Sequence, residues 1–130
     1  MKKFRILAAC LVCFFTLVGC SSRSAYIMNV NQPIAAHYSI EQVKTAIIQA
    51  GQQREWVMTP VAPGVINGHI NQRGHIADIR INYSTSSYSI NYVSSQNLRA
   101  ANGKIHRNYN RWINNLDREI QLRLSAQLIK

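Results

Sequence analysis

Hydrophobic and polar positions alternate along the middle of the chain, over residues 55–94. In HIADIRINY, every second residue is apolar, and Asp78, Arg80 and Asn82 fall between them. YSINYVS and GVINGHINQ alternate in the same way, and EWVMT, ended by Pro60, is a shorter run of the same kind. A period of two residues is typical of a half-buried β-strand. The middle of the chain therefore predicts four strands.

Short loops between these runs define a pairing register. A two-residue loop at Arg73-Gly74 pairs Ile70 with Ala77, Gly68 with Ile79 and Ile66 with Ile81. A four-residue loop over 84–87 pairs Tyr83 with Tyr88, Ile81 with Ile90 and Ile79 with Tyr92. Apolar side chains meet throughout, whereas a shift of one residue would turn each to the wrong face. We expect an antiparallel meander, in which Gly68 makes room for a large neighbour such as Trp56.

Helical patterns flank the strands on both sides. Ser39 and Gln42 fit a capping box, and the helix that follows, about 40–51, ends at Gly51. A second helix is predicted from about His106 to Leu128, with an apolar stripe of Tyr109, Trp112, Ile113, Leu116, Ile120 and Leu124. Two amphipathic helices can cover one face of a sheet. The predicted fold is α+β: a two-layer sandwich of a four-stranded antiparallel sheet with two helices on one face, in the order α-β-β-β-β-α.

The N-terminus has the pattern of an export signal. A basic run over residues 1–5 precedes thirteen mostly apolar residues, 6–18, which are too few to cross a bilayer that needs about 20. Leu17-Val18-Gly19-Cys20 then resembles the lipobox of bacterial lipoproteins. The resemblance implies cleavage before Cys20, diacylglycerol on its sulfur and an acyl chain such as palmitate on its amine. An uncleaved membrane anchor is the alternative.

This interpretation also accounts for the cysteines. Cys10 and Cys13 have the C-x-x-C spacing of redox and metal sites, but they lie in the apolar segment and leave with the signal peptide. We expect a signal peptide over 1–19, a lipidated tether over 20–37 and a single domain over 38–130. Ser21 rather than aspartate follows Cys20, which resembles the sorting pattern for the outer membrane, facing the periplasm, in bacteria with two membranes.

The charge balance is strongly basic, with 15 lysines and arginines against 5 acidic residues. Cleavage would remove three of these cations and no acid. A basic domain favours anionic neighbours such as lipid headgroups, lipopolysaccharide phosphates or acidic glycans, and export argues against nucleic acid. A solvated surface that keeps the protein soluble is the alternative.

One cluster of cations is a candidate anion-binding site. Lys104, Arg107, Arg111 and Arg118 form a basic strip on the predicted last helix. Positions 111 and 118 lie about 200° from the apolar stripe and so face away from the core. The alternative is the solvated back of a helix.

Two other groups of residues are candidates for chemistry. His69 faces Asp78 in the predicted register and His75 is close in sequence, but a cross-strand polar pair is the simpler interpretation. The aromatic residues Trp56, Trp112, Tyr83, Tyr88, Tyr92 and Tyr109 suit a sugar-stacking platform or the core, and their helix-facing positions favour the core. We expect no catalytic residue, metal or cofactor.

Several motifs resemble a family of small proteobacterial envelope lipoproteins. They are Ala50-Gly51 before Trp56, the strand Tyr-x-Ile-x-Tyr at 88–92, and Ile105-His106 followed by Tyr-Asn-Arg-Trp at 109–112. The resemblance implies the compartment and the order of elements, and no activity. Glu55 departs from it, because glycine is more usual there and a tight turn would need one.

These observations favour a non-enzymatic, membrane-anchored lipoprotein that binds an envelope protein or an anionic polymer. A glycan-binding or hydrolytic module acting on envelope polysaccharide is the alternative, which a deep pocket containing Asp78 and His69 would favour. A homo-oligomer formed through Leu122 and Leu128 is a third possibility.

Overall fold

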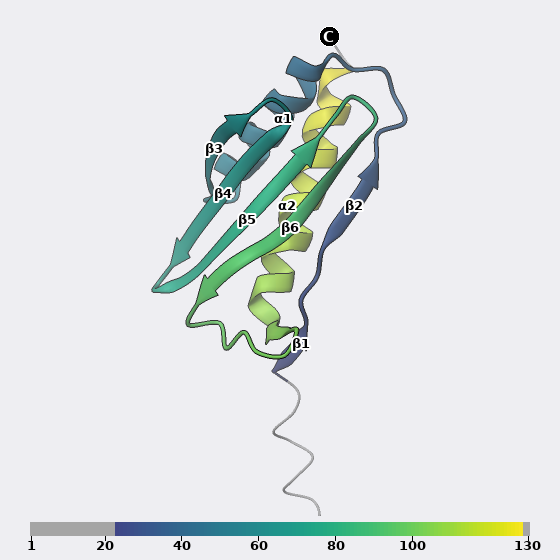
Figure 1. Ribbon diagram of the computed structural model, residues 1–130. Coiled ribbons are helices and arrows are strands. Elements are labelled where there is room, and N and C mark those ends of the chain that lie inside the picture. The colour runs from purple at the N-terminus through teal and green to yellow at the C-terminus, as the bar shows by residue number, and fades with distance from the viewer. Residues whose placement is uncertain (1–22, 129–130) are drawn as a thin grey trace, which may run out of the picture.

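The computed structural model describes residues 23–128, which form two helices and two antiparallel sheets (Figure 1). The main sheet has the order β2-β6-β5-β4-β3 and contains β2 (Val30–Pro33), β3 (Val57–Ala62), β4 (Val65–Gln72), β5 (His75–Tyr83) and β6 (Ser87–Gln96). A small sheet pairs β1 (Ser24–Tyr26) with β7 (Lys104–His106). The helices α1 (Ile40–Gln53) and α2 (Arg107–Gln127) both lie on one face of the main sheet.

The predicted α+β class and the two helices are confirmed, but the four-stranded sheet and its order are wrong. A fifth strand, β2, pairs with β6 and places Val30 opposite Ile90 and Gln32 opposite Tyr88. Both β1 and β2 come from the stretch expected to be a tether. They have 3 and 4 residues, which is too short for an alternating pattern to stand out.

The predicted register of the central strands is confirmed. Ile66 pairs with Ile81, Ile70 with Ala77, and Tyr83 with Tyr88. The register shifts between Asp78 and Ile79, because Val93 of β6 is an extra residue there. The apolar face of β4, β5 and β6 is buried beneath the helices, while the opposite face exposes residues such as His69, Arg80 and Asn82.

The first predicted strand does not end at Pro60. Strand β3 continues to Ala62, and its register with β4 shifts between Pro60 and Ala62. Proline is tolerated here because β3 is an edge strand, whose outward N–H groups have no partner strand.

The predicted helix starts are confirmed. Ser39 Oγ accepts from the backbone N–H of Gln42, and the Gln42 side chain accepts from the N–H of Ser39, which completes the capping box. At the other helix, His106 Nδ1 accepts from the N–H of Asn108, so a histidine supplies the N-cap of α2.

The close approach of α1 to the sheet depends on two glycines. The side chain of Met58 occupies the space where a Cβ on Gly51 would lie, and its sulfur is 3.3 Å from the Cβ position of Gly68. The atom nearest to that position is Ile79 Cγ1, at 2.8 Å, from the paired strand. Met58, rather than the predicted Trp56, is therefore the large neighbour from the first strand of the meander.

A buried carboxylate ties α2 to the sheet. Asp117 is 9% exposed and accepts from the hydroxyl of Tyr88 at 2.5 Å and from Gln32 Nε2 at 3.0 Å. Burial, followed by the hydrogen bond to Asp117 and its charge, raises the pKa of Tyr88 above the ordinary value for a phenol. The hydroxyl therefore keeps its proton and donates a hydrogen bond to the carboxylate. Burial likewise raises the pKa of Tyr109.

Candidate functional site

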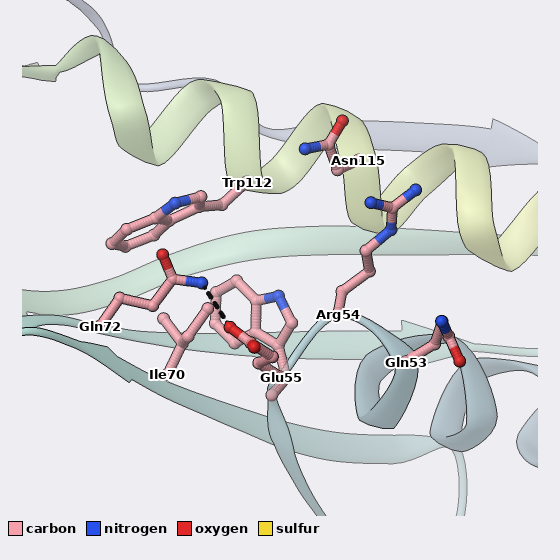
Figure 2. Close-up of a pocket in the computed structure, with 8 residues that line it drawn as sticks. Gln53, Arg54, Glu55, Ile70, Gln72, Trp112 and Asn115 are labelled. Carbon is pink, nitrogen blue, oxygen red and sulfur yellow. Dashed lines mark hydrogen bonds between the residues drawn. The ribbon is translucent and has the colours of Figure 1, made fainter.

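A groove runs between α2 and the end of α1, over the second half of β4 (Figure 2). Its upper cavity, of about 250 Å³, is lined by residues that include Arg54, Glu55, Gln72 and Trp112. A neighbouring cavity of about 570 Å³, which we call the lower cavity, shares Glu55, Gln72 and Trp112 and adds Arg111. The two cavities adjoin at these three residues, and we call them together the groove.

The groove combines an aromatic wall with amides. In Figure 2 the indole of Trp112 extends from α2 above Gln72 and Ile70, and Asn115 lies on the next turn of the helix. Gln72 Nε2 donates to Glu55 Oε2 at 2.9 Å, which fixes the amide beside the indole. Trp112 is 8% exposed, so a small part of the indole can contact an apolar face of a ligand, while the amides exchange hydrogen bonds with its polar groups.

The charges around the groove differ in how they are paired. Arg54 Nε lies 3.5 Å from Glu119 Oε1, and Arg123 Nε lies 3.2 Å from Glu119 Oε2. Arg73 and Arg111, which line the lower cavity, have no carboxylate within 4.0 Å in the part of the chain that the structure describes. Two guanidinium groups against the carboxylate of Glu55 give the lower cavity a net positive charge.

The four candidate anion-binding residues are all exposed. Arg107, Arg111 and Arg118 lie on α2 within about 40° of one another around its axis and span about 16 Å along it. We call these three residues the arginine line. Lys104 does not belong to it, contrary to the prediction: it lies on β7, with Nζ 5.2 Å from the ring centroid of Tyr26. The helix begins only at Arg107, because His106 caps it.

The carboxylates of residues 23–128 are bonded elsewhere or lie apart from the arginine line. Glu119 is shared by Arg54 and Arg123, Asp117 is buried against Tyr88, and Glu55 accepts from Gln72. The other two are Asp78, which bonds His69, and Glu41, in the first turn of α1. Within the described residues, no ion pair neutralises the arginine line, so its charge is available to an external anion.

Glu55 forms a tight turn despite not being glycine. Its φ is 69°, in the left-handed region, and the N–H of Trp56 donates to the carbonyl of Gly51 at 2.9 Å. The N–H of Glu55 donates to the carbonyl of Gln52, so the end of α1 is a Schellman motif. The tight turn is thus present without a glycine, and it places the Glu55 carboxylate in the groove.

Replacement of Glu55 by glycine is expected to raise the free energy of unfolding by about 0.5–1 kcal/mol, because glycine adopts a positive φ without the cost that other residues pay. Urea unfolding followed by tryptophan fluorescence measures the change. Glu55→Ala is the matched control, since it removes the carboxylate but keeps the backbone strain. A glycine variant no more stable than the alanine variant would show that the positive φ at position 55 does not lower stability.

The pair of His69 and Asp78 forms as the register predicts. His69 Nδ1 and Asp78 Oδ1 are 2.8 Å apart, and Ser94 Oγ donates to Asp78 Oδ2 at 3.3 Å. Both side chains are exposed, at 48% and 40%, on the open face of the sheet. His75 is not part of this pair and lies within hydrogen-bonding distance of the carbonyl of Gln72. In the described residues, no three histidine, cysteine or acidic side chains gather to hold a metal ion.

The aromatic residues are mostly in the core, as predicted. Trp56, Trp112, Tyr88 and Tyr109 are buried, and Tyr92 is partly buried and meets Tyr109 edge to face. The two tryptophans also line the groove, which the core interpretation did not include. Tyr83 is partly buried against the core.

The lipobox and Cys20 lie outside the described residues. Of the helices in residues 23–128, neither is long and apolar enough to cross a membrane.

No protein-family model and no curated protein matches the chain. The fold and the groove define an α+β domain with an aromatic, amide-rich groove beside a line of exposed arginines.

Proposed function

We propose that the protein is a lipid-anchored, non-enzymatic binding module of the cell envelope that holds an anionic polymer along α2. The observation that carries the proposal is the arginine line: Arg107, Arg111 and Arg118 are exposed and aligned, without an ion-pair partner among residues 23–128. A guanidinium group binds carboxylate or phosphate oxygens through two parallel hydrogen bonds.

The groove favours a polymer that contains sugars. Arg111 belongs both to the arginine line and to the lower cavity, beside Trp112 and Asn108. An acidic glycan bound to Arg111 would bring sugar rings to the indole and hydroxyl groups to the amides. This surface suits binding better than hydrolysis, because the only paired histidine and carboxylate of the described residues, His69 and Asp78, lie on the open sheet face.

The lipid anchor is the second part of the proposal. The lipobox at residues 17–20 and the serine at position 21 support a mature protein acylated on Cys20, in the outer membrane and facing the periplasm. The expected partners are the membrane, through this anchor, and the polymer, with no nucleic acid and no cofactor. Leu122 and Leu128 are exposed, at 63% and 59%, so self-association is an outcome that light scattering would reveal.

The binding test uses the full chain in neutral detergent, titrated with polygalacturonate as a carboxylated glycan and with dextran as an uncharged one. We expect binding to polygalacturonate only, weakened about tenfold or more when Arg107, Arg111 and Arg118 are all changed to alanine, because each exposed contact contributes about 0.5–1 kcal/mol. Raising the salt concentration should weaken binding as well.

The control for charge alone is the triple change of Lys44, Arg80 and Arg99 to alanine. These residues lie on α1, the open sheet face and the loop after β6, and none of them belongs to α2. This variant loses the same formal charge and should bind within about twofold of the wild type, since a local site depends on position more than on total charge. Equal weakening in both triple variants would contradict a site on α2.

A further inference from the structure

The first described residues, 23–26, are hydrogen-bonded to the rest of the domain. Arg107 N–H donates to the carbonyl of Arg23 at 3.1 Å, and Ser24 and Tyr26 pair with His106 and Lys104 across β1 and β7. The side-chain amide of Asn110 then donates to the carbonyl of Tyr26 at 2.9 Å. Residues 23–26 are therefore part of the domain, next to the first turn of α2 (Figure 1).

This attachment leaves a short link to the proposed site of lipidation. Cys20 and Arg23 are three residues apart, and three residues span at most about 11 Å even when fully extended. If Cys20 carries its acyl chains in a bilayer, the end of the domain that contains β1 and β7 lies close to the headgroups. The predicted tether of 18 residues would have allowed the domain to stand far from the membrane.

That end of the domain carries several cations and no acid. We call it the anchor end and define it as residues 23–26, the β4–β5 turn at 73–74 and residues 97–107. Asn97 Nδ2 donates to the carbonyl of Gly74 at 2.6 Å, which holds the turn beside the loop after β6. Its cations, all exposed, are Arg23, Arg73, Arg99, Lys104 and Arg107, and its segments contain no aspartate or glutamate.

An exposed aromatic residue lies among these cations. Tyr26 is 75% exposed, and its ring lies beside the ammonium group of Lys104. Tyrosine and lysine are both suited to the boundary between headgroups and acyl chains, because each has an apolar body and a polar tip. Clustered lysines and arginines are attracted to anionic headgroups within about one Debye length, roughly 8 Å at physiological salt.

We infer that the anchor end is a docking surface for an anionic lipid bilayer, on which Arg99, Lys104, Arg107 and Tyr26 seat the domain beside its own lipid anchor. The inference rests on the proposed acylation of Cys20 and deepens the proposed function. It places Arg107 nearest the membrane, with Arg111 and Arg118 successively further along α2. A bound polymer would then be held close to the bilayer surface.

The test measures which end of α2 is near the lipid. The purified acylated protein is placed in phosphatidylcholine vesicles with or without phosphatidylglycerol, with a fluorophore on Ala100→Cys or, in a second sample, on Ser125→Cys. Ala100 is exposed in the anchor end, whereas Ser125 is exposed on α2 about 27 Å beyond Arg107. Headgroup spin-labelled lipid then quenches each fluorophore according to its distance from the surface.

We expect several-fold stronger quenching at position 100 than at 125 in vesicles with phosphatidylglycerol. Changing Arg99, Lys104 and Arg107 together to glutamine should reduce that ratio, whereas changing Lys44, Arg80 and Arg118 to glutamine should not. Equal quenching at both positions, or a ratio that the first triple variant leaves unchanged, would overturn the docking surface.

Two further readouts separate this inference from the proposed function. The intact mass of the same sample shows whether Cys20 is acylated, and an unmodified residue would overturn both the anchor and the docking surface. Polygalacturonate binding in detergent tests the polymer site alone. Polymer binding with equal quenching at both labels would reject the docking surface only. Stronger quenching at position 100 without polymer binding would reject the polymer site only.

Discussion

Replacement of Asp117 by alanine should lower the free energy of unfolding by about 3 kcal/mol. The carboxylate accepts hydrogen bonds from Tyr88 at 2.5 Å, Gln32 at 3.0 Å and Gln121 at 3.2 Å. Tyr88 is 3% exposed, and alanine leaves its hydroxyl only the backbone carbonyl of residue 117, at 3.5 Å. Hydrogen bonds to a charged group contribute about 1.5–3 kcal/mol, and a buried donor left without a partner costs about 1–3 kcal/mol.

Urea unfolding followed by circular dichroism measures this change, with Asp117→Asn as the control. Asparagine keeps an oxygen for Tyr88 and should cost less than alanine, since it removes the charge but not the acceptor. A loss below about 1 kcal/mol for the alanine variant would show that the Asp117 network contributes little to stability.

Replacement of Gly51 by valine should cost about 2–3 kcal/mol, although valine is no worse than glycine in most helices. The reason is the side chain of Met58, whose Cγ, Sδ and Cε all occupy the space that a Cβ on Gly51 would need. Gly51 is buried where α1 packs on the sheet, so α1 or Met58 must shift.

A double-mutant cycle with Met58→Ala tests this explanation. Met58→Ala alone should destabilise by leaving a cavity, and the valine should then fill part of it. The valine substitution should therefore be neutral or stabilising in the alanine background, a reversal of sign measured by thermal or urea unfolding. An equal cost of the valine in both backgrounds would mean that contacts other than Met58 set the requirement for glycine.

Local patterns in the sequence were sufficient to predict the helices and the central register. The Arg73-Gly74 turn pairs Gln72 with His75 as expected, because both turn residues adopt a positive φ, at 54° and 84°. The prediction of Trp56 as the large neighbour of Gly68 failed, because an irregularity in β3 decides which residue lies opposite Gly68. The irregularity between Pro60 and Ala62 places Met58 opposite Gly68, whereas an uninterrupted register from the Pro63-Gly64 turn would place Thr59 there.

The site was only partly predictable. The outward positions of Arg107, Arg111 and Arg118 follow from the helical period, since the apolar stripe of α2 fixes which side is exposed. The groove does not follow from any local pattern, because it depends on where α1 ends relative to α2 and β4. Asp117 did carry a signal that was not used: it lies four residues after Ile113 and three before Ile120, within the apolar stripe.

The central claim is that anions bind along α2, and nuclear magnetic resonance of the full chain in neutral detergent tests it most directly. Titration with polygalacturonate should shift the side-chain Nε–H signals of Arg107, Arg111 and Arg118 and the indole signal of Trp112, with Arg80 on the open sheet face unchanged. Shifts centred on Arg80, or spread equally over all the arginines, would contradict the claim.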